Sequence, residues 1–228
     1  MEKNLIFASS AIRQSRNNLK FKKKDIIQRE NDYFFCLQQL QRVVPSNFEI
    51  YIVDNSLDSL NSLLNQDLKL LLNTMNIELT YKPNTPEVKN IGVAELKQLF
   101  HLENIIDFKK YSKICYFSSR RFITNPYVFE KTERLNENAL IANPDFTYLD
   151  GRILKSEKKG MYNDMFFAMK NKTMMDYIEY SKERIEYLDV NMINSESNLF
   201  NFITENNISY EFINYFGFLR YDYFTKKK

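Results

Sequence analysis

The sequence predicts a single α/β domain with a mostly parallel central sheet, helices on both faces and a mixed C-terminal half. Three observations support this fold class. Short apolar segments alternate with helix-like patterns through the first half of the chain, which is typical of βαβ units. No Pro-, Gly- or Ser-rich linker divides the 228 residues, so we expect one domain over 1–228. Apolar residues make up 44% of the chain, enough for a sizeable core.

The first half contains four strand-like segments separated by helices. We expect the strands at 4–11, 48–56, 77–82 and 113–119, and the helices at 25–44, at 57–75 and within 83–106. The helix over 25–44 ends before Pro45. Its apolar residues at helical spacing are Ile27, Phe34, Leu37, Leu40 and Val44. In the segment 48–56 the alternation gives way to a fully apolar run, as in a central parallel strand, and Asp54-Asn55-Ser56 is expected to open the next helix.

The second half, from residue 123 onward, has a different pattern. Three β-prone segments follow one another at 139–143, 146–154 and 160–169, then two helices at 171–187 and 194–206, then a short strand at 209–216. We interpret this half as a mixed extension of the same sheet.

Composition excludes several classes of function. With only four glycines, the chain contains neither a Walker loop nor a Rossmann fingerprint. One His and two separated cysteines, Cys36 and Cys115, give no metal-ligand spacing and indicate a reducing compartment. The absence of a signal peptide and of a long apolar run indicates a cytoplasmic protein. The basic runs at 20–24 and 226–228 are either solvated surface or a peripheral contact with an anionic membrane.

Polar side chains collect where the expected strands end. In open parallel sheets this edge binds ligands. The residues delivered there include hydroxyls, an acid and two guanidinium groups, which suit an anionic ligand that carries hydroxyls. They are Ser9, Ser10, Asp54, Asn55, Ser56, Lys82, Asn84, Ser118, Ser119, Arg120 and Arg121.

Several segments together resemble GT-A-type sugar-nucleotide glycosyltransferases, above all the bacterial and viral types that build capsule and lipopolysaccharide glycans. The resemblance rests on "FASSA" at 7–11, "IYIVDNS" at 50–56, "KNIGVAELKQL" at 89–99 and "KICYFSSRRF" at 113–122. "YNDMFFAMK" at 162–170 and Glu196, on a helix before Gly217-x-x-Arg220, fit the same layout. It spans most of the chain and implies a Rossmann-like GT-A domain, with a nucleotide-binding half over 1–122 and an acceptor-side half over 123–228. Ser119 and Phe122 stand where the family pattern has Gly and Tyr.

One departure from the family concerns the metal. The family usually holds Mn²⁺ or Mg²⁺ on the pyrophosphate with an Asp-x-Asp motif, and this sequence has none. The nearest triplet, Glu30-Asn31-Asp32, is expected in a helix start far from the edge where ligands bind. Arginine also neutralises phosphate, so we hypothesise that Arg120 or Arg121 replaces the metal. The alternative is that both arginines pair with surface acids.

The resemblance also implies roles in donor binding. Asp54 and Asn55 would bond the ribose or base, although both could simply cap the next helix. Lys89 would meet a phosphate, or be a solvated lysine, and Glu95 would bond a sugar hydroxyl, or be exposed on its helix. Ser9, Ser10 and Ser118 would complete the donor site.

Transfer to an acceptor needs a carboxylate base when the reaction inverts the anomeric centre. We favour Asp164, whose aromatic neighbours would raise its pKa by desolvation, and place Glu196 second. Asp150 and Tyr162 are expected on the acceptor side. The alternative for each acid is a structural hydrogen bond, and for Ser195-Glu196 a helix cap.

The expected function is therefore the transfer of a sugar from a UDP-, GDP- or CMP-type donor to a glycan or lipid-linked acceptor. Two other hypotheses stay open: a nucleic-acid-associated α/β protein, and a catalytically inactive transferase-like module that serves in assembly. The net charge of only +3 argues against nucleic acid as the partner.

Overall fold

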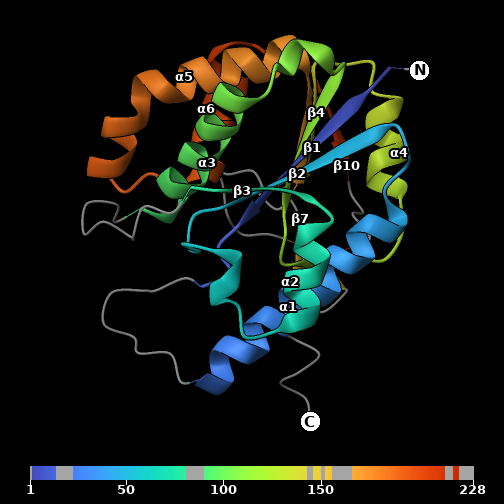
Figure 1. Ribbon diagram of the computed structural model, residues 1–228. Helices are drawn as coiled ribbons and strands as arrows, with labels where there is room; N and C mark the ends of the chain where they lie inside the picture. Colours follow the sequence, from blue (N-terminus) through green and yellow to red (C-terminus); the bar gives the residue numbers. More distant parts are fainter. Residues whose placement is uncertain are drawn as a thin grey trace.

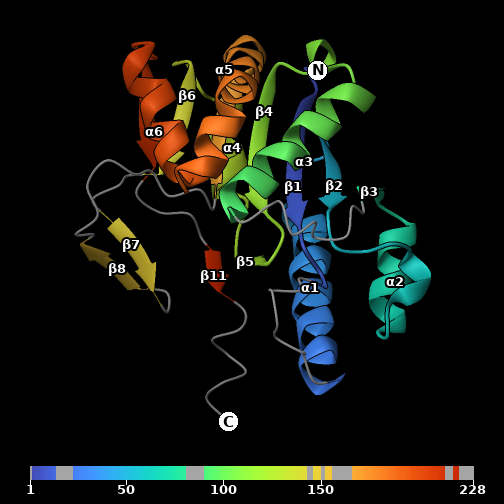
Figure 2. The same cartoon turned by 90° about the vertical axis from the view of Figure 1, so that its left-hand side faces the viewer.

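The molecule has three layers, a central sheet with helices packed on both of its faces (Figures 1 and 2). The computed structural model describes residues 2–13, 23–80, 90–142, 146–149, 152–155, 166–213 and 218–220. One face of the sheet carries α1 (Lys23–Val43), α2 (Gln66–Asn73) and α4 (Tyr127–Glu133). The other carries α3 (Ile91–Ile105), α5 (Asn171–Val190) and α6 (Ser195–Glu205). Short 3₁₀ turns lie at Leu60–Ser62 and Phe108–Lys110.

The central sheet has the order β10-β6-β9-β4-β1-β2-β3 and draws on both halves of the chain. Its strands, in chain order, are β1 (Asn4–Ser10), β2 (Phe48–Asp54), β3 (Asn76–Leu79), β4 (Lys113–Ser118), β6 (Ala139–Ala142), β9 (Phe166–Lys170) and β10 (Tyr210–Ile213). Among these seven, β9 alone runs antiparallel to its neighbours. The carboxyl ends of β1, β2 and β4 therefore lie along one edge of the sheet.

Two small antiparallel pairs lie apart from this sheet. One joins β5 (Arg121–Ile123) to β11 (Phe218–Arg220), and the other joins β7 (Phe146–Leu149) to β8 (Arg152–Lys155). The β5–β11 pair and the β7–β8 pair both lie toward the end of the molecule to which β4 points (Figure 2).

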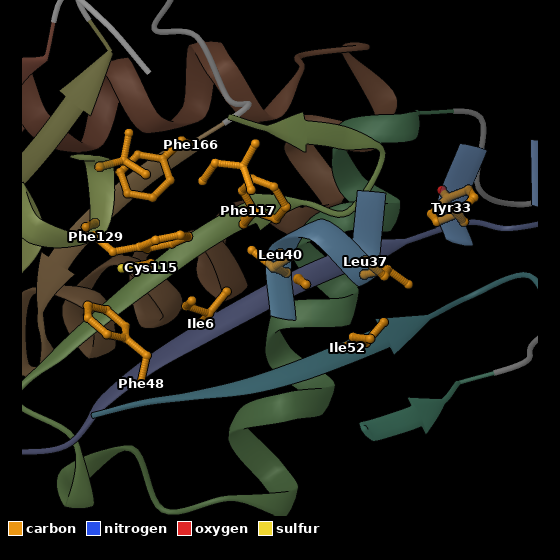
Figure 3. Packing of buried hydrophobic residues seen from close by; sticks show 14 of the residues in the cluster. Ile6, Tyr33, Leu37, Leu40, Phe48, Ile52, Cys115, Phe117, Phe129 and Phe166 are labelled. Atoms are coloured by element: carbon orange, nitrogen blue, oxygen red, sulfur yellow. The ribbon is translucent and has the colours of Figure 1, made fainter. Parts of the chain in front are cut away.

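The sheet has an apolar core on each face, which explains why the sequences of its strands are continuous apolar runs. All seven residues of β1 are buried, because alternate side chains enter opposite cores. Ile6 and Phe117 pack with Leu37 and Leu40 of α1 and with Phe129 of α4 (Figure 3). The opposite core joins the other side chains of these strands to α3, α5 and α6.

The predicted fold class is confirmed: an α/β fold with a seven-stranded, mostly parallel mixed sheet flanked by helices. The mixed extension by the second half is also present, as β9, β6 and β10. The prediction that 146–154 extends the central sheet was wrong, because β7 and β8 pair with each other in a separate sheet, and it missed β5, α4 and β11.

The helix predicted over 57–75 begins later than expected. Asp54-Asn55-Ser56 does not open it; α2 starts at Gln66, and its N-cap is Asn65, whose side chain accepts the N–H of Leu68 at 2.8 Å. Residues 55–65 instead form a loop with one 3₁₀ turn. Side chains distant in sequence fix this loop, since Glu30 binds the N–H groups of Leu64 and Asn65.

The buried stripe of α1 also differs from the prediction. Ile27 is exposed, while Glu30 and Tyr33 are buried in line with Leu37 and Leu40. The stripe that faces the sheet therefore becomes polar toward the start of the helix. In the described part of the chain, no helix combines the length and apolar character needed to cross a membrane.

Gly92 lies where α3 packs closely against the start of α6. A Cβ added at this position would lie 2.4 Å from the backbone nitrogen of Ser195, which is far inside van der Waals contact. We expect Gly92→Ala to destabilise the protein by about 1–3 kcal/mol and to lower Tm by roughly 2–12 °C in thermal unfolding. Lys97→Ala, on the exposed side of the same helix, is the control and should leave Tm nearly unchanged. Equal Tm values for the two variants would contradict the close packing.

Because the thiol of Cys115 is buried, we expect the free energy of unfolding to decrease at alkaline pH. Burial in β4 raises the pKa of its thiol to about 12. Because the folded pKa exceeds the unfolded value of about 8.5, the stabilisation is full below that pH and falls as pH rises toward 12, by up to about 1.4 kcal/mol per unit. Denaturant unfolding between pH 8 and 11 should show this slope in the wild type and a shallower one in Cys115→Val. Identical slopes would argue against a buried, protonated thiol.

Candidate functional site at the carboxyl edge of the sheet

The carboxyl ends of three parallel strands bring the predicted donor residues together. Ser9 of β1 lies opposite Ser118 of β4, and Ser10 lies opposite Asp54 of β2. The antiparallel β9 starts at the same edge, since Phe166 pairs with the residue before Ser118. Successive residues of a strand face opposite ways, so Ser9 faces α3 and Ser10 faces α1. The edge therefore has two sides, separated by β1.

On the α1 side, the carboxylate of Asp54 organises the loops after β1 and β2. The residue is 0% exposed, and its two oxygens accept five hydrogen bonds of 2.7–2.9 Å. The donors are the Ser10 hydroxyl, the Ile12 N–H, the Ser56 N–H and hydroxyl, and the Leu57 N–H. A buried carboxylate is tolerated because its charge is met by so many donors.

This arrangement favours a structural role for Asp54, and the contact of Asp54 with a ribose or base stays a prediction. Its oxygens are turned into the protein and are saturated by main-chain and serine donors, so we assign Asp54 to the framework of the site. Asn55 differs: its N–H donates to the Ser10 carbonyl at 3.3 Å, and its side chain is half-buried. A ligand contact by the Asn55 amide stays a prediction.

The turn that follows β1 has its main-chain groups satisfied within the protein. The carbonyl of Ser10 accepts the side-chain amide of Gln98 at 2.6 Å, and those of Ala11 and Ile12 accept the Arg29 guanidinium. The N–H groups are also engaged: Ala11 donates to the Tyr33 hydroxyl at 3.0 Å and Ile12 to Asp54. Phosphate-binding loops expose such N–H groups to the ligand. Here, anion binding at this turn must come from side chains.

A second buried carboxylate, Glu30 of α1, fixes the loop that precedes α2. It is 0% exposed and accepts Arg13 at 3.0 Å together with the N–H groups of Leu64 and Asn65 at 2.8 and 2.6 Å. Arg13 also donates to the Ser62 carbonyl. This clamp holds the 55–65 loop in place, and it explains why the predicted helix starts only after Asn65.

Arg120 stands directly after Ser118-Ser119, at the turn between β4 and β5. Its guanidinium nitrogen lies 3.9 Å from a carboxylate oxygen of Asp32, and its side chain is 28% exposed. Arg29 is close enough that the charge of Arg120 contributes, after burial, to lowering the Arg29 pKa. Burial likewise raises the pKa of the neighbouring Tyr33, over which Arg29 lies at 5.5 Å.

The prediction that Glu30-Asn31-Asp32 lies far from the edge was wrong. The helix α1 starts at Lys23 and extends beyond the sheet at this edge (Figure 2), so Asp32 reaches Arg120. Arg121 is the first residue of β5, which packs against α1, and it pairs in register with Arg220 of β11. It is half-buried.

On the α3 side, a second group of polar residues surrounds a narrow apolar pocket. The Ser9 hydroxyl bonds the Tyr116 hydroxyl at 2.8 Å. The Ser195 hydroxyl donates to Glu95 at 3.2 Å, so Glu95 is not simply exposed on its helix. The pocket has room for about one water molecule and is lined by Phe7, Glu95, Leu96, Leu99, Tyr116, Phe167, Tyr177 and Ser195.

The second candidate base, Glu196, lies in the first turn of α6. Asn194 caps this helix by accepting the Ser197 N–H at 2.9 Å. The observed cap is therefore one residue before the predicted cap at Ser195-Glu196. Glu196 is half-buried in the first turn, beside the residue that bonds Glu95. Asn90 joins this region to α3, since its side chain accepts the Gly92 N–H and donates to the Leu188 carbonyl.

The described residues of this edge do not include a cluster of metal-binding side chains. Among the described residues, no group of three His, Cys, Asp or Glu side chains could hold a metal ion. The nearest acids are already engaged, Glu30 by Arg13 and by two N–H groups, and Asp32 by Gln28 at 2.9 Å and by Arg120. The divalent cation that the GT-A pattern implies therefore does not fit these residues.

Four predicted site residues, Lys89, Asp150, Tyr162 and Asp164, lie outside the described residues. The site residues that the sequence did not single out are mostly polar side chains in buried positions of helices: Arg13, Arg29, Asp32, Tyr33, Gln98 and Ser195.

Comparisons with known proteins place the fold. No protein-family model matches the sequence, and no curated protein sequence is significantly similar to it. A putative nucleotide-diphospho-sugar transferase of Desulfovibrio desulfuricans matches with a TM-score of 0.57 and 9% identity, over 94% of this chain and 80% of that one. The 4-diphosphocytidyl-2C-methyl-D-erythritol synthase of Anaerococcus prevotii matches with a TM-score of 0.52 and 14% identity, over 93% and 89%. The chain therefore has a GT-A/nucleotidyltransferase-like fold.

Asp54→Asn separates a framework role from a ligand role. The substitution replaces one acceptor oxygen with an NH₂ group that faces N–H and O–H donors, and we expect a loss of about 1–3 kcal/mol in the free energy of unfolding. Denaturant titration measures this loss. Asn55→Asp, at the half-buried neighbouring position, is the control and should cost much less. An Asp54→Asn protein with wild-type stability would show that the carboxylate does not hold the loops.

Proposed function

We propose that this protein is a glycosyltransferase that moves a sugar from a nucleoside-diphosphate donor to a hydroxyl-bearing acceptor. The diphosphate would bind on the α1 side of the carboxyl edge, beside Arg120, and the sugar would face the α3 side, near Glu95. The observation that carries the proposal is the position of an arginine at the end of β4, at the edge where sheets of this type bind ligands.

The names of the structurally similar proteins support the choice of ligand. One name describes a nucleotide-diphospho-sugar as the substrate, and the other describes a diphosphocytidyl product. Both therefore contain a nucleotide joined through a diphosphate. The negative charge that the diphosphate carries as a leaving group must be neutralised. A guanidinium neutralises it with two parallel N–H donors.

The chemistry requires few groups. The bond between the anomeric carbon and the diphosphate oxygen breaks, and its electron pair leaves on the diphosphate. The acceptor oxygen bonds the anomeric carbon and loses its proton to a carboxylate, if the reaction inverts that centre. We propose Asp164, which stands two residues before β9 in the sequence, as this base, with Glu196 as the second candidate. Lys89, which immediately precedes the N-cap of α3, would contact the phosphates.

A nucleotidyltransferase is the second candidate, because the match to the diphosphocytidyl-methylerythritol synthase covers 89% of that enzyme. The two reactions differ in the leaving group. A glycosyltransferase releases a nucleoside diphosphate, whereas a nucleotidyltransferase that joins a nucleoside triphosphate to a sugar or polyol phosphate releases pyrophosphate.

Nucleotide binding is the first test. We expect UDP, GDP or CDP to raise Tm, because a ligand at 100 times its Kd adds about 2.7 kcal/mol to the stability of the folded state. Arg120→Ala or Arg121→Ala should reduce this shift and weaken binding about tenfold or more in calorimetry, since a charge-assisted bond is worth about 1.5–3 kcal/mol. Arg42→Ala, at the exposed far end of α1, is the matched control and should bind as the wild type does.

Product analysis completes the test. Incubation with nucleotide sugars and glycan acceptors should release a nucleoside diphosphate, and incubation with nucleoside triphosphates and sugar phosphates should release no pyrophosphate. The proposal fails if none of the three nucleotides changes Tm, with or without Mn²⁺. Pyrophosphate release alone would favour the second candidate.

A further inference from the structure

We propose that Asp32 restrains Arg120 and competes with the diphosphate for it, so that the nucleotide product can dissociate. This inference rests on the proposed function, and it assigns Asp32 as a positioning residue that acts through Arg120. It differs from a metal-ligand role for Asp32, which would give the opposite effect on binding.

The first support is the placement of the Asp32 carboxylate. It is 3% exposed in the polar first half of α1, at the edge of the sheet where Arg120 emerges. One carboxylate oxygen accepts the Gln28 amide at 2.9 Å, and the other lies 3.9 Å from the Arg120 guanidinium. Gln28 thus holds the carboxylate from one turn away on the same helix, α1. The charged contact joins α1 to Arg120, which follows β4.

The second support is the geometry of the ion pair. At 3.9 Å the two charges attract, but the nitrogen and oxygen are too far apart for a hydrogen bond. The Arg120 side chain is 28% exposed, whereas that of Asp32 is 4% exposed. Part of the guanidinium is therefore accessible to a phosphate group from the solvent, whereas the carboxylate is enclosed by the protein.

The third support is the set of charges around this pair. Arg29 adds a second positive charge, and its guanidinium is bound to the carbonyls of Ala11 and Ile12. Asp54 contributes a negative charge that is held by its own five donors. The fixed charge of Arg29 would add to the attraction of Arg120 for a diphosphate. The charge of Asp32 lowers that affinity, because the diphosphate must displace one negative partner of Arg120 before it binds.

The closing experiment compares Asp32→Asn with the wild type in calorimetric titrations with UDP, GDP and CDP. Asparagine keeps the shape of the side chain and its oxygen for Gln28 and removes the charge. We expect the best of these nucleotides to bind about tenfold more tightly, and the gain to shrink at high salt. In turnover assays, the KM for the donor and kcat should both fall, since product release becomes slower.

Two controls keep the test specific. Asp25→Asn removes the same charge from the exposed first turn of α1 and should leave affinity unchanged. In an Arg120→Ala background, Asp32→Asn should have no effect on affinity, because the residue acts through the arginine. If Asp32→Asn does not fold, Asp32→Ser replaces it, with the same expected sign.

The outcomes separate this inference from the proposed function. If the wild type binds none of the nucleotides, the proposed function fails. If the wild type binds but Asp32→Asn binds equally or more weakly, only the role of Asp32 is overturned. A loss of Mn²⁺-dependent binding in that variant would assign Asp32 to a metal instead.

Discussion

The arrangement of the carboxyl edge depends on one buried charge, the carboxylate of Asp54. Five donors from the loops after β1 and β2 converge on its two oxygens. A charge this deeply buried is stable only when it is fully hydrogen-bonded, so the carboxylate and the loops depend on each other. The loops hold the carboxylate, and the carboxylate fixes the path of the loops. Gln98 and Arg29 then bind the carbonyls that remain, from opposite faces of the sheet. The edge is therefore a hydrogen-bonded framework, and it positions the side chains that could contact a ligand.

This frame divides the site into two chemical environments. On the α1 side lie guanidinium groups and the acids that balance them, with Arg120 as the partly exposed member. On the α3 side lie hydroxyls and a carboxylate, with Ser9 bonded to Tyr116 and Ser195 bonded to Glu95. The division follows from β1, because adjacent residues of a strand point to opposite faces. The proposed donor would match these two environments, with its anionic leaving group on the α1 side and its hydroxyl-rich sugar on the α3 side.

The sequence predicted the parallel core well, because apolar runs and helical spacing are local signals. It failed where distant residues decide the structure. The start of α2 depends on Glu30 binding the N–H groups of Leu64 and Asn65, an interaction across more than thirty residues that no local pattern reveals. The polar residues of α1 did carry a usable signal, since Glu30 and Tyr33 continue the stripe of Leu37 and Leu40. A carboxylate on a stripe that faces the core is expected to have a buried partner. The position of Arg120 at the end of β4 could be predicted from the sequence, but its partner Asp32 could not be predicted without the direction of α1.

The scarcity of glycine links composition to the proposed chemistry. Phosphate-binding turns are commonly rich in glycine, which lets the main chain approach an anion and present its N–H groups. This chain has four glycines, and the turn after β1, within residues 10–13, contains none. Side chains hold that turn instead: Tyr33, Asp54 and Ser56 bind its N–H groups. The same contacts that stabilise the turn remove the main-chain donors that a phosphate would use. At this turn, the proposed anionic ligand would rely on charged side chains, and in the proposed site the Asp32 carboxylate would balance Arg120 so that the product is not held too tightly.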